Sequence, residues 1–227
     1  MLKLGLLGRD IQHSKSKSMY EKIFAQNVDY ELLDYATDVS IPSLSEIFSK
    51  LQGLSITAPY KKHFLKELVM AEDIRKLDAV NCIRVENEQF YGTNTDYSAL
   101  SEIFLESRYQ DYEIIILGSG SMANITEVFL NSKRLDYQKV SRKTHGDISK
   151  VNISLIKKSD KKTLVINACA RSYLFEGELP LDSVFWDYNY SHEGNRSYVS
   201  KIAKYIDGTE LLYRQAVHAT KFWNLIP

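Results

Sequence analysis

Short apolar runs alternate with polar turns along the whole chain, and their spacing predicts which runs are strands and which are helices. An apolar run bounded by turn residues is typical of a strand, whereas apolar residues recurring every three to four positions are typical of a helix. In the first half, strands are predicted at residues 4–7, 30–33, 54–58, 79–85 and 89–92. Helices are predicted at residues 16–26 and from Pro42 to a capping glycine, Gly53.

The second half repeats this alternation with more strongly apolar strands. Residues 113–117 form a continuous apolar run, as expected of a strand that is covered on both faces. A glycine-containing turn and a helix to Asn131 follow, then further strands at 138–140, 164–166 and 184–186 and a last helix at 210–224. Strands that alternate with helices over the whole chain predict an α/β fold with largely parallel sheets.

A chain of 227 residues is long enough for one large domain or two small ones. We place a boundary in the helix and polar connector at 100–111. The sequence then predicts a first domain at 1–100, onto which the C-terminal helix 209–227 packs back, and a second domain at 101–208.

Composition and charge argue against several classes of protein. Lys plus Arg and Asp plus Glu both total 29, so the formal charge of zero gives no reason to expect a nucleic-acid or membrane partner. The apolar runs are far shorter than the roughly 20 residues of a membrane-spanning helix. The 2 cysteines are too few for a disulfide scaffold, and the histidines lack the spacing of metal ligands. We therefore expect a cytoplasmic protein without a metal, present as a monomer or homodimer.

The turn after the apolar strand has the form G-x-G-x-x-A, with Gly118, Gly120 and Ala123 at the fixed positions and Ser119 and Ser121 between them. The glycines permit a tight turn and a close approach of the backbone to a pyrophosphate, and the helix N-terminus provides N–H donors. Because the motif lies within a strand–turn–helix–strand unit, a dinucleotide site explains it better than a merely tight turn.

The end of the next strand distinguishes NAD from NADP. A site for NAD typically has an acidic residue there, which binds the ribose 2′-hydroxyl. This chain has Ser141, Arg142 and Lys143 instead. A guanidinium binds a 2′-phosphate through charge-assisted hydrogen bonds, so Arg142 favours NADP. For Lys143, a solvated basic turn is an equally good interpretation.

Polar residues also lie at the ends of predicted strands in the first half. Ser14 and Ser16 stand where a helix begins, and they could hold a carboxylate or cap the helix; spacing alone favours the cap. Lys61 follows a strand that Pro59 ends, and Asp96 follows another strand. Open α/β sheets bind ligands at such strand ends, but composition alone favours a surface lysine and a helix N-cap.

Taken together, the motifs occur in a specific order over nearly the whole chain: His13-Ser14-x-Ser16, Ser55-x-Thr57-x-Pro59-x-Lys61, Ala79-Val80-Asn81-x-Ile83, Asn94-Thr95-Asp96, the glycine turn, Ser141-Arg142-Lys143, Asn167-Ala168-Cys169, Asp187-x-x-Tyr190 and Gly208-x-x-Leu211-x-x-x-Gln215-Ala216 with Phe222-Trp223. In this order and spacing they resemble the shikimate dehydrogenase family. The resemblance implies a substrate-binding α/β domain, a Rossmann-like NADP-binding domain and a cleft between them. It also implies reversible, NADPH-dependent reduction of 3-dehydroshikimate to shikimate in aromatic amino-acid biosynthesis, with these small molecules as the partners.

The resemblance assigns roles to individual residues. Lys61 and Asp96 would be the catalytic pair. Ser14 and Ser16, with Tyr190 nearby, would bind the substrate carboxylate. The ring oxygens would be bound by Thr57, Asn81 and Gln215. The cofactor would be bound by Gly118, Ser119, Gly120, Ser121, Ala123, Ser141, Arg142, Lys143, Asn167 and Ala168.

Some positions depart from the family pattern: Lys17 replaces a proline, Ser55 an asparagine, Ser121 a third glycine and Cys169 a threonine. The chain is also trimmed between Lys143 and Leu164. The catalytic pair is retained. Two other functions stay open: a paralogue that acts on quinate or a related cyclic hydroxy acid, and a non-catalytic sensor that binds a dinucleotide.

Overall fold

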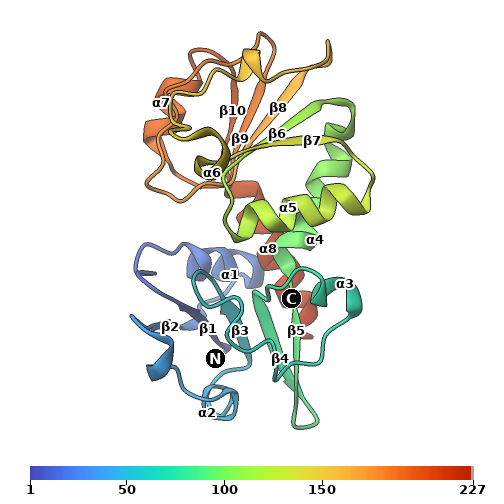
Figure 1. Ribbon diagram of the computed structural model, residues 1–227. Helices are drawn as coiled ribbons and strands as arrows, with labels where there is room; N and C mark the ends of the chain where they lie inside the picture. The colour runs from blue at the N-terminus through green and yellow to red at the C-terminus, as the bar shows by residue number, and fades with distance from the viewer. Residues whose placement is uncertain (226–227) are drawn as a thin grey trace. The chain divides into compact units, whose positions relative to one another are not determined.

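The computed structural model describes residues 1–225. The chain divides into two compact units, Met1–Ala99 with Leu212–Pro227 and Leu100–Leu211, and each is built around a 5-stranded sheet (Figure 1). The helices α4 (Thr95–Glu106) and α8 (Thr209–Phe222) each contribute residues to both units.

The first unit is a mixed sheet with short helices. Its elements are β1 (Lys3–Gly8), α1 (Ser16–Phe24), β2 (Asp29–Asp34), η1 (Asp38–Ser40), α2 (Leu44–Phe48), β3 (Gly53–Ile56), α3 (Glu72–Arg75), β4 (Cys82–Glu86) and β5 (Gln89–Thr93). In the order β2-β1-β3-β4-β5, β1 runs parallel to both of its neighbours, whereas β4 runs antiparallel to both of its own. Most strand pairings of the described chain are parallel, as expected, and the antiparallel ones lie in this unit, where Asn87 and Glu88 adopt positive φ in the tight turn that joins β4 and β5 as a hairpin.

Gly53 is not the helix cap that the sequence predicts. α2 begins at a capping box formed by Ser43 and Glu46 and ends at Phe48, and Gly53 is the first residue of β3. A Cβ at Gly53 would lie 2.5 Å from the indole ring of Trp223. The glycine therefore makes room for a side chain from the C-terminal helix.

The core of the first unit includes both ends of the chain. One cluster of buried side chains joins Leu4, Tyr20, Val28 and Cys82 to Ala216, Ala219 and Trp223 of the C-terminal segment. The indole Nε1 of Trp223 also donates a hydrogen bond of 2.9 Å to the carbonyl of Ile83 in β4. The second half of α8 is thus an integral part of this unit.

The second unit is a doubly wound parallel sheet. Its further elements are η2 (Tyr109–Asp111), β6 (Glu113–Leu117), α5 (Ser121–Ser132), β7 (Tyr137–Val140), α6 (Arg142–His145), η3 (Ile153–Leu155), β8 (Thr163–Asn167), β9 (Val184–Asp187), α7 (Glu193–Val199) and β10 (Lys204–Ile206). All paired strands are parallel, in the order β10-β9-β8-β6-β7. The strand order reverses between β6 and β8, which is the position where such sheets bind ligands.

The two faces of this sheet are covered differently. On one face, Phe104 of α4 and Phe129 of α5 pack with ring centroids 5.1 Å apart. On the other, Ile115 and Leu117 contact a cluster of buried residues from irregular segments and α7: Ile148, Ile153, Phe175 and Val199. The short α7 and β10, which the sequence analysis does not predict, have too few residues to show a clear period.

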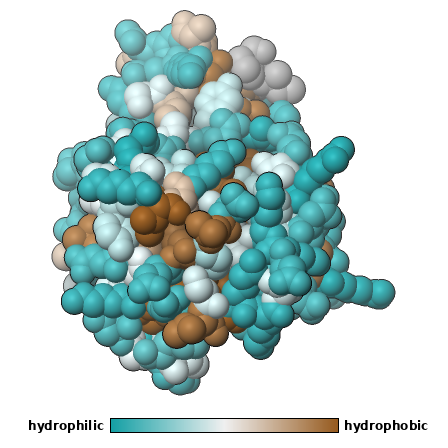
Figure 2. Space-filling model, turned by 90° about the horizontal axis from the view of Figure 1, so that it is seen from above, coloured by the Kyte–Doolittle hydropathy of each residue, from teal (hydrophilic) through white to brown (hydrophobic). Residues whose placement is uncertain are grey.

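The surface view in Figure 2 is mostly hydrophilic, with hydrophobic side chains gathered near the centre of that face. Within residues 1–225, no helix combines the length and apolar character needed to cross a bilayer.

Candidate functional site

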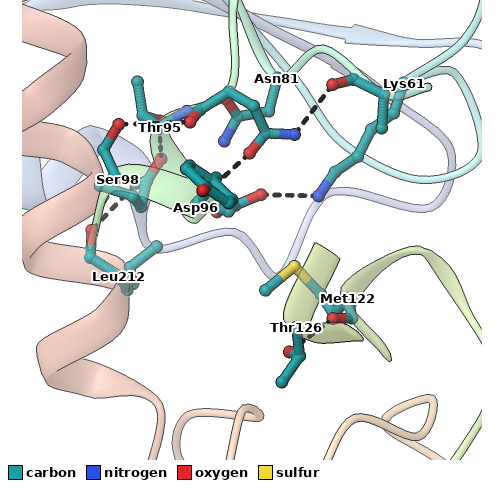
Figure 3. Close-up of polar contacts among 12 residues, drawn as sticks. Lys61, Asn81, Thr95, Asp96, Ser98, Met122, Thr126 and Leu212 are labelled. Atoms are coloured by element: carbon teal, nitrogen blue, oxygen red, sulfur yellow. Dashed lines mark hydrogen bonds and ion pairs between the residues drawn. The ribbon is translucent and has the colours of Figure 1, made fainter. Parts of the chain in front are cut away.

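Lys61 and Asp96 form a close ion pair in the first unit. The Lys61 Nζ lies 2.7 Å from the Asp96 Oδ2, and the two side chains are only 10% and 15% exposed. Figure 3 shows the ammonium pointing directly at the carboxylate. An ammonium and a carboxylate held together in a largely buried position can orient a proton toward a bound ligand.

Two local features bring this pair together. The chain leaves β3 through a turn closed by a hydrogen bond from the Tyr60 amide to the Thr57 carbonyl, and Lys61 is the next residue. Asp96 stands in the first turn of α4, where the helix dipole stabilises a carboxylate. Asn94 fixes this helix start, because its Nδ2 donates to the Ala79 carbonyl and its Oδ1 accepts from the Tyr97 amide.

Asn81 and Gln215 are joined to the same region by Thr95. The Asn81 Oδ1 accepts a hydrogen bond of 2.7 Å from the Thr95 amide. The Thr95 hydroxyl lies 3.2 Å from the Asn81 Oδ1 and 3.4 Å from the Gln215 Oε1. Thr95, which the sequence analysis assigned no role, therefore sits next to Asp96 and links two of the expected ring-binding residues.

Ser14 and Ser16 contact each other at the start of α1. Their hydroxyl oxygens are 3.1 Å apart, and the Ser16 amide donates to the Ser14 Oγ. Lys15 occupies the N-cap position without a side-chain cap bond. Neither serine is the N-cap residue, and both hydroxyls are held on one side of this turn.

Thr57 and Ser55 lie on β3 or directly after it. The Thr57 amide donates to the Leu7 carbonyl, and a Cβ at Gly8 would lie 2.6 Å from the Thr57 methyl group. The Ser55 Oγ lies 3.1 Å from the hydroxyl of Tyr20, which is fully buried. Burial, and next the neighbouring Tyr30, raise the pKa of Tyr20, so this hydroxyl stays neutral and remains a donor. The Ser55 hydroxyl is thus already hydrogen-bonded to Tyr20.

The second unit contains a pocket of about 620 Å³ at the carboxyl ends of its strands. It is lined by the glycine turn 118–120, by Arg142 and by most of the segment 168–176. Gly118 has φ +108, and a Cβ there would lie 3.1 Å from the Ala168 carbonyl oxygen and the Cys169 Sγ. The strained turn therefore packs directly on the start of this segment.

Two observations indicate that a phosphate-bearing group fits this pocket. A Cβ at Gly120 would meet no atom within 4 Å, so packing does not explain the glycine. The Ser121 Oγ, in the first turn of α5, is buried and has no hydrogen-bond partner among the described residues. A helix N-terminus with open space and an unpaired hydroxyl suits an anionic ligand.

The expected cofactor residues separate into two groups. Gly118, Ser119, Gly120, Arg142 and Ala168 line the pocket. Ser121 lies at the start of α5, and Ala123 is fully buried in it. Like Ser121 and Ala123, three further residues do not line the pocket: Ser141, Lys143 and Asn167.

Asn167 has a clear alternative role. It is fully buried; its Nδ2 donates to the Asp187 Oδ1 and its Oδ1 accepts from the Cys169 amide. Ser141 is buried against Thr144 at the start of α6, with their hydroxyl oxygens 3.0 Å apart. Neither residue presents its side chain to the pocket.

Tyr190 and Cys169 of this unit also have defined surroundings. Tyr190 stands after β9, where its ring lies 5.6 Å from the Arg171 guanidinium and its carbonyl accepts from Arg171. Burial, and next the Asp187 carboxylate, raise the pKa of the Cys169 thiol to about 11, so this pocket residue is an uncharged thiol. No group of three or more His, Cys, Asp or Glu residues that could hold a metal ion occurs in the described part of the chain.

Comparison with known proteins finds similar sequences and one matching domain model. Residues 6–83 match the family model for the shikimate dehydrogenase substrate binding domain. A shikimate dehydrogenase (NADP(+)) of Clostridium botulinum is 24% identical over 257 residues, which span 99% of this chain and 97% of the relative.

Solved structures agree over the whole chain. Shikimate 5-dehydrogenase from Thermus thermophilus in complex with shikimate has a TM-score of 0.77 at 20% identity, over 100% of this chain and 94% of that one. Quinate dehydrogenase from Corynebacterium glutamicum in complex with NAD has a TM-score of 0.69 at 21% identity, over 100% and 95% of the two chains.

By class, this is an α/β protein that combines a lysine–aspartate site in one unit with a Rossmann-type pocket in another. Over nearly its whole length the chain is similar to shikimate dehydrogenases, and residues 6–83 match the model of their substrate binding domain.

Proposed function

We propose that this protein is an NADP-dependent shikimate dehydrogenase, which reduces 3-dehydroshikimate reversibly to shikimate in aromatic amino-acid biosynthesis. The observation that carries the proposal is the buried pair of Lys61 and Asp96, whose charged atoms are 2.7 Å apart. A protein that only sensed a dinucleotide would have no use for such a proton-transfer pair. We further propose that it works in the cytoplasm, as a monomer or homodimer without nucleic-acid or membrane partners.

The pair suits the chemistry of a ketone reduction. NADPH held in the second unit would supply the hydride for such a reduction, and the substrate's carbonyl oxygen would then carry developing negative charge. The Lys61 ammonium stabilises that charge and gives its proton to the oxygen. Asp96 holds the Lys61 side chain in position and helps to return a proton to it. In the reverse direction, Lys61 accepts the hydroxyl proton.

The other polar side chains of the first unit would hold the substrate. Ser14 and Ser16 would bind its carboxylate at the start of α1, where the helix dipole favours an anion. Thr57, Asn81 and Gln215 would bind the ring oxygens. In the second unit, the glycine turn 118–120 at the start of α5 would hold the cofactor phosphates, and Arg142 would bind the 2′-phosphate.

Replacement of the lysine tests the catalytic assignment. Lys61→Ala should lower the rate of shikimate oxidation by about 10² to 10⁴-fold, because the proton-transfer group is lost. The affinity for NADP⁺ should stay close to the native value. Absorbance of the reduced nicotinamide measures the rate, and calorimetry measures cofactor binding.

Lys62→Ala is the matched control, since Lys62 is the neighbouring residue and forms an exposed ion pair with Asp78. Lys62→Ala should leave the rate of shikimate oxidation and the affinity for NADP⁺ unchanged. Near-native turnover of Lys61→Ala would refute the assignment.

The same assay with quinate in place of shikimate, and NAD in place of NADP⁺, separates the proposed reaction from that of a quinate-specific paralogue. Absence of turnover with every combination would leave a dinucleotide-binding sensor.

A further inference from the structure

A buried carboxylate lies beneath the pocket of the second unit and is not explained by the catalytic assignment. Asp187, the last residue of β9, is fully buried. Its Oδ1 accepts from the Asn167 Nδ2 and from the amide and the Nδ2 of Asn189, at 2.9 to 3.0 Å. Its Oδ2 accepts from the Asn195 Nδ2 at 2.9 Å and from the Tyr205 hydroxyl at 3.2 Å. Each of these neighbours donates, and both carboxylate oxygens therefore accept hydrogen bonds from several side chains at once.

One set of these donors leads to the beginning of the pocket wall. The Asn167 side chain, held by Asp187, accepts the Cys169 amide at 3.1 Å. The Asn189 Nδ2, held by the same oxygen, also lies 3.3 Å from the Cys169 carbonyl. Both polar backbone groups of a pocket-lining residue are therefore bound by side chains that Asp187 orients.

The other set leads to the end of the same wall. The Asn195 Oδ1 accepts the Phe175 amide at 2.8 Å, and its Nδ2 also lies 3.4 Å from the Tyr173 carbonyl. Tyr173 lines the pocket, and the side chain of Phe175 is buried behind it. No described helix or strand lies between β8 and β9. The segment is held by these side-chain bonds together with backbone bonds from the Ala168 amide to the Leu117 carbonyl and from the Glu176 amide to the Ser149 carbonyl.

We propose that Asp187 is a positioning residue for cofactor binding: through Asn167 and Asn195 its carboxylate fixes both ends of the segment 168–176, which forms one wall of the dinucleotide pocket. The inference rests on the proposed NADP-binding function. It explains why Asn167, which resembles a cofactor contact in the sequence, is fully buried in the structure. Asn167 acts on the pocket through the backbone of the next residues.

The test compares two substitutions that each remove one donor from the Asp187 Oδ2. Asn195→Ala also releases the Phe175 amide and the Tyr173 carbonyl, whereas Tyr205→Phe removes a hydroxyl that has no bond to the segment 168–176. Asn195→Ala should raise the Kd for NADP⁺, measured by calorimetry, by about tenfold, because a buried amide loses its partner. Tyr205→Phe should leave that Kd within about twofold of the native value, since its hydroxyl contributes only to the carboxylate.

Hydrogen exchange of the free protein gives a readout that does not depend on the cofactor. The Phe175 amide should exchange faster in Asn195→Ala, because its acceptor is lost. In Asp187→Asn, the Cys169 and Phe175 amides should both exchange faster. The new NH₂ group would face the donors that now bind the Asp187 carboxylate, so Asn167 and Asn195 would lose their orientation. In Tyr205→Phe, the Cys169 and Phe175 amides should exchange at the rates of the native protein.

If the native protein binds NADP⁺ and all three variants bind it equally well, the positioning role is refuted while the proposed function stands. If the native protein does not bind NADP⁺, the proposed cofactor is wrong and the inference about its pocket falls with it. If the amides exchange equally in Asn195→Ala and Tyr205→Phe, the segment is not held by Asp187.

Discussion

Neighbouring residues of the same type have different surroundings in this protein. The Lys61 side chain is 10% exposed and contacts Asp96, whereas the Lys62 side chain is 64% exposed and pairs with the exposed Asp78. An ion pair on the surface is worth little, but a largely buried one holds a defined geometry. Arg142 and Lys143 differ in the same way, because only Arg142 lines the pocket of the second unit.

This difference leads to a prediction about cofactor choice. Arg142→Gln should weaken NADP⁺ binding by about tenfold or more, because a charge-assisted bond to the 2′-phosphate is lost. Binding of NAD, which lacks that phosphate, should change little. Calorimetric titration with both dinucleotides measures the two effects. Lys143→Gln is the control and should bind both as the native protein does; an equal loss of NADP⁺ and NAD affinity in Arg142→Gln would contradict the assignment.

At the scale of elements, two glycines have opposite reasons for being glycine. Gly53 begins β3 against the indole of Trp223, where a Cβ would lie 2.5 Å from the ring. Gly120 caps α5 with φ −81 and ψ −172, an extended conformation that alanine also adopts, and a Cβ there would meet nothing within 4 Å. The first glycine serves packing between elements, whereas the second borders open space at the start of α5.

Alanine substitutions should separate these two reasons. Gly53→Ala should lower the free energy of unfolding by about 1 to 3 kcal/mol through overpacking, and leave NADP⁺ binding intact. Gly120→Ala should lower it by less than about 1 kcal/mol, since only an N-cap preference changes. The same substitution should weaken NADP⁺ binding severalfold, because the methyl group occupies the space that a phosphate needs. Denaturant unfolding and calorimetry provide the measurements, and unchanged binding by Gly120→Ala would contradict a phosphate at this turn.

At the scale of the whole molecule, the first unit depends on a segment from the far end of the chain. Residues 212–227 belong to it, and Ala216, Ala219 and Trp223 share a buried cluster with Leu4 and Tyr20. The second unit is continuous from Leu100 to Leu211.

Truncation after Leu211 should therefore affect the units unequally. The first unit should lose its cooperative unfolding transition, because removal of Trp223 alone would cost about 3 to 5 kcal/mol. The second should still bind NADP⁺ and keep its own transition. Calorimetric melting with and without NADP⁺ follows both units. A first unit that melts unchanged after the truncation would contradict the role of the C-terminal segment.

The alternation of apolar and polar residues determined most of the elements by itself. The strands β1, β2, β6, β8 and β9 lie within two residues of their predicted ends, because each carries a compact apolar run between polar turns. The glycine turn at 118–120 was identifiable for the same reason: its chemistry is local, and it follows directly on a strand.

Tertiary structure alone decided which polar residues meet. Lys61 and Asp96 are 35 positions apart, and nothing in their immediate sequence distinguishes them from a surface lysine and a helix cap. Asn167 and Asp187, 20 positions apart, are likewise joined only by the pairing of β8 with β9. The packing of Gly53 on Trp223 was also settled by a distant contact. Periodicity indicates which residues of a helix or strand face the core and which face solvent. A site depends instead on distances between segments, and only the folded chain defines these distances.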